Sequence, residues 1–227
     1  MSAPFEVRFS LEPAYTRRSL FAIELLDAVT LSRVTQGIKV VAEGMKGRPI
    51  VNSSGLFVWQ QEPLEPLMKV SIDPGALPYE HTEVLKADLA LPPAPVPLTT
   101  IQLSPRADYP FQTGVTGMRG VLLEDRTLPR RPVAGADARL RWLDADGNWR
   151  DAPTMSRTNA DGDFVSFLRF AASDVPGLDL NKALTVRLRV VRDGATRESS
   201  DLKLPQGRIA DSSTLSALTF AWDELQP

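Results

Sequence analysis

The chain has 227 residues, of which 43% are hydrophobic and 24% are charged. This composition is ordinary for a soluble globular protein, and it excludes a wholly disordered chain, a collagen and a coiled coil. The 26 Lys and Arg against 28 Asp and Glu give a net charge of −2, which disfavours general binding of nucleic acid. Because cysteine is absent, disulfides, thiolate metal sites and cysteine nucleophiles are excluded.

The N-terminal segment lacks the apolar core of a signal peptide, because Glu6 and Arg8 interrupt its hydrophobic residues. No stretch approaches the ~18–20 apolar residues that a membrane helix needs. We therefore expect a protein without membrane insertion. It is expected to be cytoplasmic, or to be incorporated into a virion or injection particle without a signal peptide.

A period of two residues predicts β-strands along most of the chain. Phe5, Val7 and Phe9 alternate with polar residues, which places one set of side chains on a buried sheet face. Short apolar runs between Gly, Pro, Asn or Asp residues predict further strands. These alternating or apolar segments are 20–27, 37–43, 68–72, 138–142, 163–170, 186–190 and 213–222. The pattern is typical of an antiparallel all-β fold.

Three motifs recur in the same order in the two parts of the chain, which indicates an internal repeat. The matching segments are 37–41 and 135–139, 51–58 and 158–165, and 88–92 and 201–205, with a last candidate strand after each copy at 99–103 and 215–220. The second copy carries an extra hairpin, 142–149. We therefore predict two β-sandwich domains, 1–111 and 112–227.

The junction between the predicted domains is the segment 104–112, which contains Pro105 and Pro110. A short connection stiffened by proline restricts the relative orientation of two domains. The richer proline cluster at 92–97 lies inside the first copy, before its last strand, so we do not interpret it as the linker.

The second motif predicts a tight turn that enters a strand. Asn52 and Asn159 can accept backbone N–H groups in an Asx turn, and Gly55 and Gly162 can supply a positive φ. The phenylalanine two positions after each glycine is then expected to fill the core.

The second copy resembles carboxypeptidase-regulatory-like domains, within the transthyretin-like and Ig-like β-sandwich group. The residues that carry this resemblance are Gly120-Val121, Thr127, Pro132-Val133-Ala134-Gly135-Ala136 and Thr158-Asn159-Ala160-Asp161-Gly162-Asp163-Phe164. The first copy departs from the pattern, since Pro132 has no counterpart and Gln36-Gly37-Ile38 replaces Ala-Gly-Ala. The resemblance implies a seven-stranded sandwich used for attachment or interaction, without catalytic residues.

Two acidic turns in the second copy offer oxygen ligands for calcium. They contain Asp144 and Asp146, and Asp161 and Asp163, and they could share one end of the sandwich. The spacing departs from that of an EF-hand, and Asp-Gly between strands is an ordinary hairpin signal. We expect hairpin turns and no cofactor or metal, with calcium binding as the alternative.

Few residues suggest catalysis or ligand binding. His81 is the only histidine, and no Gly-x-Ser-x-Gly elbow accompanies it, so we expect a surface or turn residue. Trp142 is expected in the core, whereas Trp149 is expected to be partly exposed, where it can stack on a sugar or anchor a partner. Trp222, near the C-terminus, is a second candidate for contact with another chain.

Together these features favour a non-enzymatic structural or protein-interaction module built from two tandem Ig-like sandwiches. The expected partners are other protein subunits of a larger assembly. Proteins of this composition resemble accessory components of phage tails and phage-tail-like contractile injection particles. Two alternatives stay open: a carbohydrate- or ligand-binding module that uses Trp149, and an enzyme of unrecognised type that uses His81 or a pair of carboxylates.

Overall fold

The structure is a computed structural model that describes residues 19–60, 64–211 and 218–227. The strand predicted around Phe5, Val7 and Phe9 lies outside these residues. Among them the regular structure is almost entirely β, and the exceptions include two 3₁₀ helices, η1 (Lys86–Asp88) and η3 (Trp222–Glu224). The prediction of an all-β chain is therefore confirmed.

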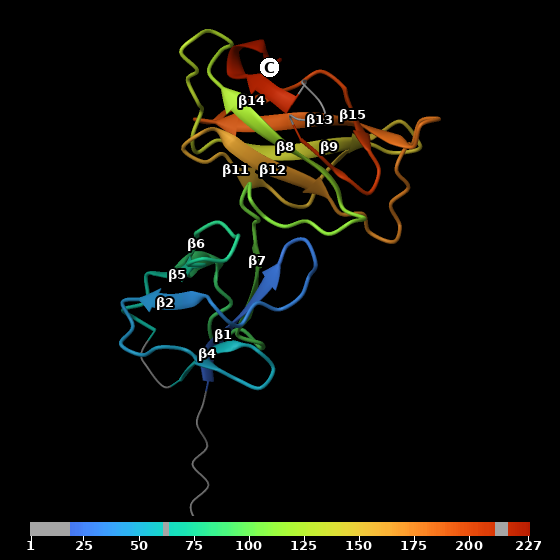
Figure 1. Ribbon diagram of the computed structural model, residues 1–227. Coiled ribbons are helices and arrows are strands. Elements are labelled where there is room, and N and C mark those ends of the chain that lie inside the picture. The colour runs from blue at the N-terminus through green and yellow to red at the C-terminus, as the bar shows by residue number, and fades with distance from the viewer. Residues whose placement is uncertain (1–18, 61–63, 212–217) are drawn as a thin grey trace, which may run out of the picture.

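Two sheets form the first half of the molecule, in the lower part of Figure 1. One has the strand order β3-β4-β1-β7 and the other has the order β2-β5-β6. Their buried side chains belong to one hydrophobic core. The strands are β1 (Ser19–Asp27), β2 (Lys39–Glu43), β3 (Ile50–Val51), β4 (Phe57–Gln60), β5 (Lys69–Asp73), β6 (Thr82–Leu85) and β7 (Leu98–Leu103).

The second half again has two sheets around a separate core, in the upper part of Figure 1. One has the order β10-β9-β13-β14, with β11 also paired to β9 and β15 to β13; the other has β12-β8-β16, with β17 also paired to β8. The strands are β8 (Thr116–Leu123), β9 (Asp137–Leu143), β10 (Trp149–Asp151), β11 (Ser156–Arg157), β12 (Asp163–Leu168), β13 (Ala183–Arg192), β14 (Ala195–Glu198), β15 (Leu202–Pro205), β16 (Ile209–Ala210) and β17 (Thr219–Ala221).

The two halves repeat one strand order. Strand β1 lies between antiparallel β4 and parallel β7, as β8 lies beside antiparallel β12 and parallel β17. In the other sheet, β5 lies between β2 and β6 as β13 lies between β9 and β15. The prediction of purely antiparallel sheets is wrong for β7, β16 and β17, which pair in parallel with β1 or β8. The chain reaches β7 and β16 by crossing over from the other sheet, as a parallel pairing requires.

Two of the three repeated motifs occupy equivalent places in the fold. Gly37 and Gly135 precede β2 and β9 with φ values of 71° and 73°. The third motif is not equivalent, because Leu202–Pro205 forms strand β15 whereas the matching segment 88–92 starts at the last residue of η1 and contains no strand. The counterpart of β15 is β6, which takes the same place beside the central strand of its sheet. Of the last predicted strand, only Thr219–Ala221 is a strand, and residues 213–217 lie outside the described part.

The Asn-x-x-Gly turn has the same geometry in both halves. The Oδ1 atoms of Asn52 and Asn159 each accept two backbone N–H groups, from residues two and four positions later, at 2.8–3.0 Å. Gly55 and Gly162 both have φ of 77°, and the phenylalanine two positions after each is buried. The turn aims that side chain into the core, so the prediction for this motif is confirmed.

A buried carboxylate ties the first half to the connection that follows it. Asp27 is 4% exposed and its Oδ1 accepts the Val29 N–H at 2.7 Å. Its Oδ2 accepts the hydroxyl of Tyr79 at 3.1 Å and that of Tyr109 at 2.5 Å. Tyr109 lies between β7 and β8, so this bond fixes the connection against the end of β1.

Side chains from the second half hold the same connection from the other side. Arg119 donates through Nη2 to the Tyr109 carbonyl at 2.6 Å, and the Phe111 ring lies 5.8 Å from that of Phe167. Arg169 donates through Nη1 to the Ala28 carbonyl at 2.8 Å. These bonds link the two halves directly and restrain their relative orientation.

Stability at alkaline pH depends on the two buried tyrosines. Burial, with the nearby Asp27 charge and hydrogen bond, raises the pKa of Tyr79 to about 12, and it also raises the pKa of Tyr109. An unfolded tyrosine ionises near pH ~10, so above that pH the folded chain binds more protons than the unfolded chain. We expect the free energy of unfolding to fall by up to about 1.4 kcal/mol per pH unit per tyrosine between pH ~10 and ~12.

Urea unfolding of the wild type and of the Tyr79→Phe/Tyr109→Phe variant, measured from pH 9 to 11.5, tests this expectation. The variant should lose less stability across that range, because it lacks the two tyrosines that titrate. The lysines are the same in both proteins, so their titration cancels when the two slopes are compared. Equal slopes for the two proteins would contradict it.

Candidate interaction surface

Four arginines line the outward face of the larger sheet of the second half. Ala138, Leu140 and Trp142 of β9 and Val186, Leu188 and Val190 of β13 are buried, so the residues between them face outward. The register places two of the outward arginines directly opposite two others. The pairs are Arg141 with Arg187 and Arg139 with Arg189.

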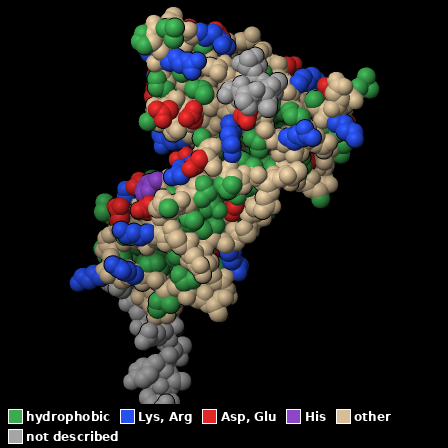
Figure 2. Space-filling view, viewed as in Figure 1, with side chains coloured by type: hydrophobic (Ala, Val, Ile, Leu, Met, Phe, Trp, Pro, Cys, Tyr) green, Lys and Arg blue, Asp and Glu red, His purple; other side chains and the backbone are tan. Residues whose placement is uncertain are grey.

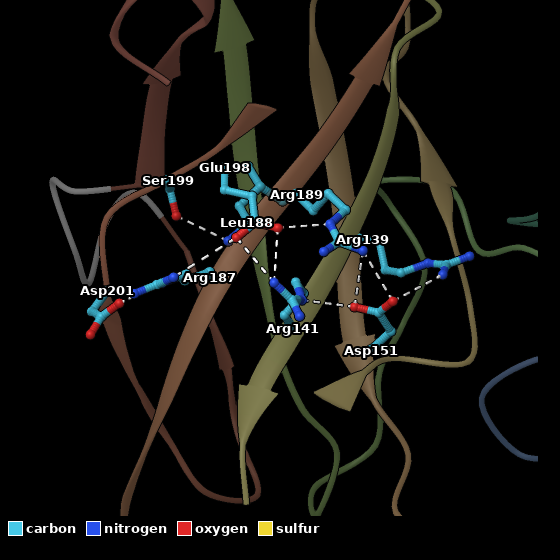
Figure 3. A network of polar contacts seen from close by, with 9 residues as sticks. All are labelled: Arg139, Arg141, Asp151, Arg187, Leu188, Arg189, Glu198, Ser199 and Asp201. Carbon is cyan, nitrogen blue, oxygen red and sulfur yellow. Dashed lines mark hydrogen bonds and ion pairs between the residues drawn. The ribbon is translucent and has the colours of Figure 1, made fainter. Parts of the chain in front are cut away.

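Carboxylates from the flanking strands separate these like charges (Figure 3). Asp151 of β10 accepts Arg141 Nε at 2.9 Å and lies 3.1 Å from Arg189 Nη1. Glu198 of β14 accepts Arg141 Nη1 at 3.0 Å and Arg189 Nε at 2.8 Å. Each carboxylate thus bridges two arginines from different strands. This arginine network links four strands of the sheet and favours their register.

The arginine network extends to Asp201 on one side and to Trp149 on the other. Arg187 Nε donates to Asp201 Oδ1 at 2.6 Å, and its guanidinium lies 4.3 Å from the centre of the Trp149 ring. Trp149 is half-buried, and this cation–π contact covers one face of its indole. A sugar therefore cannot stack on that face. Four guanidiniums meet three carboxylates here, so the surface is nearly neutral.

Trp222 has a similar environment. It begins η3 and is half-buried, and the Arg197 guanidinium lies 4.6 Å from the centre of its ring. Arg197 also donates through Nη1 to the Trp222 carbonyl at 2.7 Å. The two tryptophans predicted as contact residues are thus both paired with arginine within the chain.

The four aspartates considered for calcium lie in two separate turns. Asp144 follows the end of β9, whereas the turn that contains Asp161 is joined to the start of β9 by the Thr158 N–H bond to the Ala136 carbonyl. The possibility that both turns share one end of the sandwich is therefore wrong. In the described part of the chain no three acidic or histidine side chains gather as a metal site would require.

Within its own turn, Asp144 is already fully engaged. Its Oδ1 accepts the N–H groups of Asp146 and Asn148 at 3.0 and 2.7 Å, and its Oδ2 accepts Arg150 Nε at 2.9 Å. These bonds hold the pKa of the Asp144 carboxyl below its usual range, and the bond from the Asn148 N–H has the largest effect. Asp163 starts β12, and its N–H donates to the Asn159 cap.

The single histidine is exposed on the sheet β2-β5-β6. His81 Nε2 lies 3.4 Å from Ser71 Oγ and 3.7 Å from Glu83 Oε1 (Figure 2, purple). A serine, histidine and acid relay uses the two different ring nitrogens, one toward each partner. Here both contacts fall on the same nitrogen, and Glu83 also pairs with Lys69 at 2.5 Å. The arrangement differs from a catalytic triad.

An open cleft of about 550 Å³ lies between the two halves, beside His81. Its lining includes Glu80 and Glu83 from the first half and Asp137 and Arg157 from the second. Burial raises the pKa of the Glu80 carboxyl, although Arg106 and Arg157 oppose the shift. The cleft therefore holds a carboxyl group that takes up a proton more readily than a solvated one.

Neither the arginine network nor the bonds around Asp27 were predicted from the sequence. Alternating arginines in 138–142 and 186–190 indicated two exposed strand faces. Pairing these two strands in one sheet would have placed the four arginines side by side. The carboxylates that complete the arginine network could not be found, because their strands had not been assigned to that sheet. No local pattern marks Asp27 as buried, because its two tyrosine partners lie 52 and 82 residues away.

Comparison with known proteins finds no matching family model, curated protein or solved structure. The resemblance to carboxypeptidase-regulatory-like domains therefore stays a prediction. None of the helices in the part of the chain that the structure describes has the length and apolar character needed to cross a bilayer.

Proposed function

We propose that this chain is a non-enzymatic structural module of two tandem Ig-like, transthyretin-like sandwiches that joins a larger protein assembly, such as a phage tail or a phage-tail-like contractile injection particle. The repeated strand order supports the tandem arrangement. Its junction, bonded from both sides, gives the two halves a restrained orientation, which suits a component that sets spacing within an assembly.

The observation that carries the proposal is an apolar loop between β12 and β13. Val175 is 64% exposed, Leu178 is 42% exposed and Leu180 is fully exposed. Isolated exposed apolar residues are common, but three within six positions of one loop mark a surface that gains from being covered.

This loop has a defined shape. The Ala145 N–H donates to the Val175 carbonyl at 2.9 Å, and the Gly177 N–H donates to the Leu143 carbonyl at 3.0 Å. Asp179 Oδ1 accepts the Ala183 N–H at 3.0 Å where the loop enters β13. A preformed loop loses little conformational entropy on binding, so its apolar side chains are well suited to docking on a partner subunit.

The proposal predicts that in an extract of the producing organism the protein elutes well above its monomer mass of 24.9 kDa. The variant Val175→Ser/Leu178→Ser/Leu180→Ser should shift toward the monomer, because it loses the apolar contact. Size exclusion with immunodetection measures both. Leu128→Ser is the matched control, since Leu128 is 83% exposed in another loop, and it should behave as the wild type. Elution of the wild type as a free monomer would contradict the proposal.

A further inference from the structure

The two halves differ at one sheet edge. In the second half the outer edge of β9 is covered, because β10 pairs with residues 141–143 and β11 pairs with residues 137–138. The equivalent strand of the first half is β2, and within the described ranges it pairs with β5 alone. The segment that corresponds to β11 is β3, which pairs with β4 in the other sheet instead. Among the residues that the structure describes, strand β2 is therefore an open edge.

The outer edge of β2 presents backbone N–H and carbonyl groups that a further strand can pair with. The Glu43 carbonyl points toward β5, since it accepts the N–H of Met68 just before that strand. Successive residues direct their N–H and carbonyl groups to opposite sides of a strand, so those of Val40 and Ala42 point outward. The Ala42 carbonyl also accepts the Met45 N–H at 3.2 Å in the turn after β2, but a carbonyl oxygen has a second lone pair for another donor. Outward backbone groups on a sheet edge are a template for strand addition.

The side chains of β2 are complementary to themselves. Val40 and Ala42 face the core, so Lys39, Val41 and Glu43 lie on the outer face, where Val41 is 40% exposed. An antiparallel copy centred on Val41 places Lys39 opposite Glu43 twice and puts the two Val41 side chains together. Lys39 makes no ion pair with any residue that the structure describes, so it is available for this contact.

We propose that a second copy of this chain docks on the open edge, with β2 paired antiparallel to β2 across a twofold axis at Val41. The two three-stranded sheets then form one continuous sheet. Each copy contributes the same patch, as a twofold interface requires. Val40 and Ala42 of each copy pair with Ala42 and Val40 of the other, and opposite charges meet at both ends. The inference deepens the proposed function, because it names one contact of the assembly module.

Sedimentation equilibrium of the purified full chain over a concentration series tests the inference. We expect a monomer–dimer equilibrium with a dissociation constant on the order of 100 µM, because the interface is small. Lys39→Glu and Glu43→Lys should each weaken it about tenfold, since like charges then face each other twice. The double variant Lys39→Glu/Glu43→Lys restores the opposite charges and should recover the wild-type constant. Leu128→Lys is the control for an added surface charge and should change nothing.

Three results would overturn the inference: a monomer at all concentrations, equal weakening in the double variant, or a dimer that the single variants leave intact. A monomer at all concentrations would also be the result if the chain's own residues 1–18 occupied the edge, and it would overturn the inference in that case too. Purified protein alone is measured here, so this inference can fail while binding to other subunits in the native extract still supports the proposed function.

Discussion

Replacing Asp27 with alanine is expected to lower the free energy of unfolding by about 4 kcal/mol, the largest effect that we predict for a single polar side chain. The change leaves the buried hydroxyls of Tyr79 and Tyr109 without their acceptor and removes the cap on the Val29 N–H. It also releases the connection after β7 from the end of β1. Urea denaturation followed by tryptophan fluorescence measures the loss.

Asp73 provides the matched control. Its Oδ1 accepts the Gly75 N–H at 2.9 Å in an exposed turn, so Asp73→Ala should cost less than about 1 kcal/mol. If Asp27→Ala lost no more than this control, the buried carboxylate would not be a main support of the first half.

Gly162→Ala is expected to destabilise the chain by about 3 kcal/mol. Its φ of 77° is unfavourable for a residue with a side chain, which costs about 1–2 kcal/mol. In addition, an alanine Cβ would lie 2.4 Å from the Leu122 carbonyl oxygen, and this overlap with backbone forces the strand β8 away. Thermal and urea unfolding of the variant measure the combined effect.

Gly147→Ala separates the two contributions. Gly147 has a φ of 82° in the hairpin between β9 and β10, but a Cβ there has no neighbour within 4 Å. That variant should therefore lose only about 1 kcal/mol, from the backbone conformation alone. Equal losses at the two positions would contradict the close approach of the turn to β8.

Features that depend on neighbours in the sequence were predictable. Alternation in 138–142 and 186–190 identified the buried faces of β9 and β13, because each side chain's direction follows from strand geometry alone. The Asn-x-x-Gly turns were also predictable, since the amide caps N–H groups two and four positions away. The hairpin at 142–149 followed from its Asp-Gly turn, and it is present as β9 and β10.

Features that depend on strand pairing were not predictable. The parallel pairing of β7 with β1 joins residues more than 70 positions apart, and no local pattern specifies its direction. Strands β3 and β11 both lie just before an Asn-x-x-Gly turn but join different sheets, so the motif alone does not reveal the difference. The candidate surface had the same limit, because the acidic partners of Arg141 come from two other strands.

The central claim is that one strand order occurs twice and that its first occurrence leaves the edge at β2 open. Amide hydrogen exchange of the intact chain at several concentrations tests it most directly. At low concentration we expect fast exchange at Val40 and Ala42 and slow exchange at Val41, while successive amides of Arg141–Leu143 in β9 are all slow. Raising the concentration should then slow Val40 and Ala42. Unbroken protection along β2 at the lowest concentration, or alternating protection in β9, would contradict the claim.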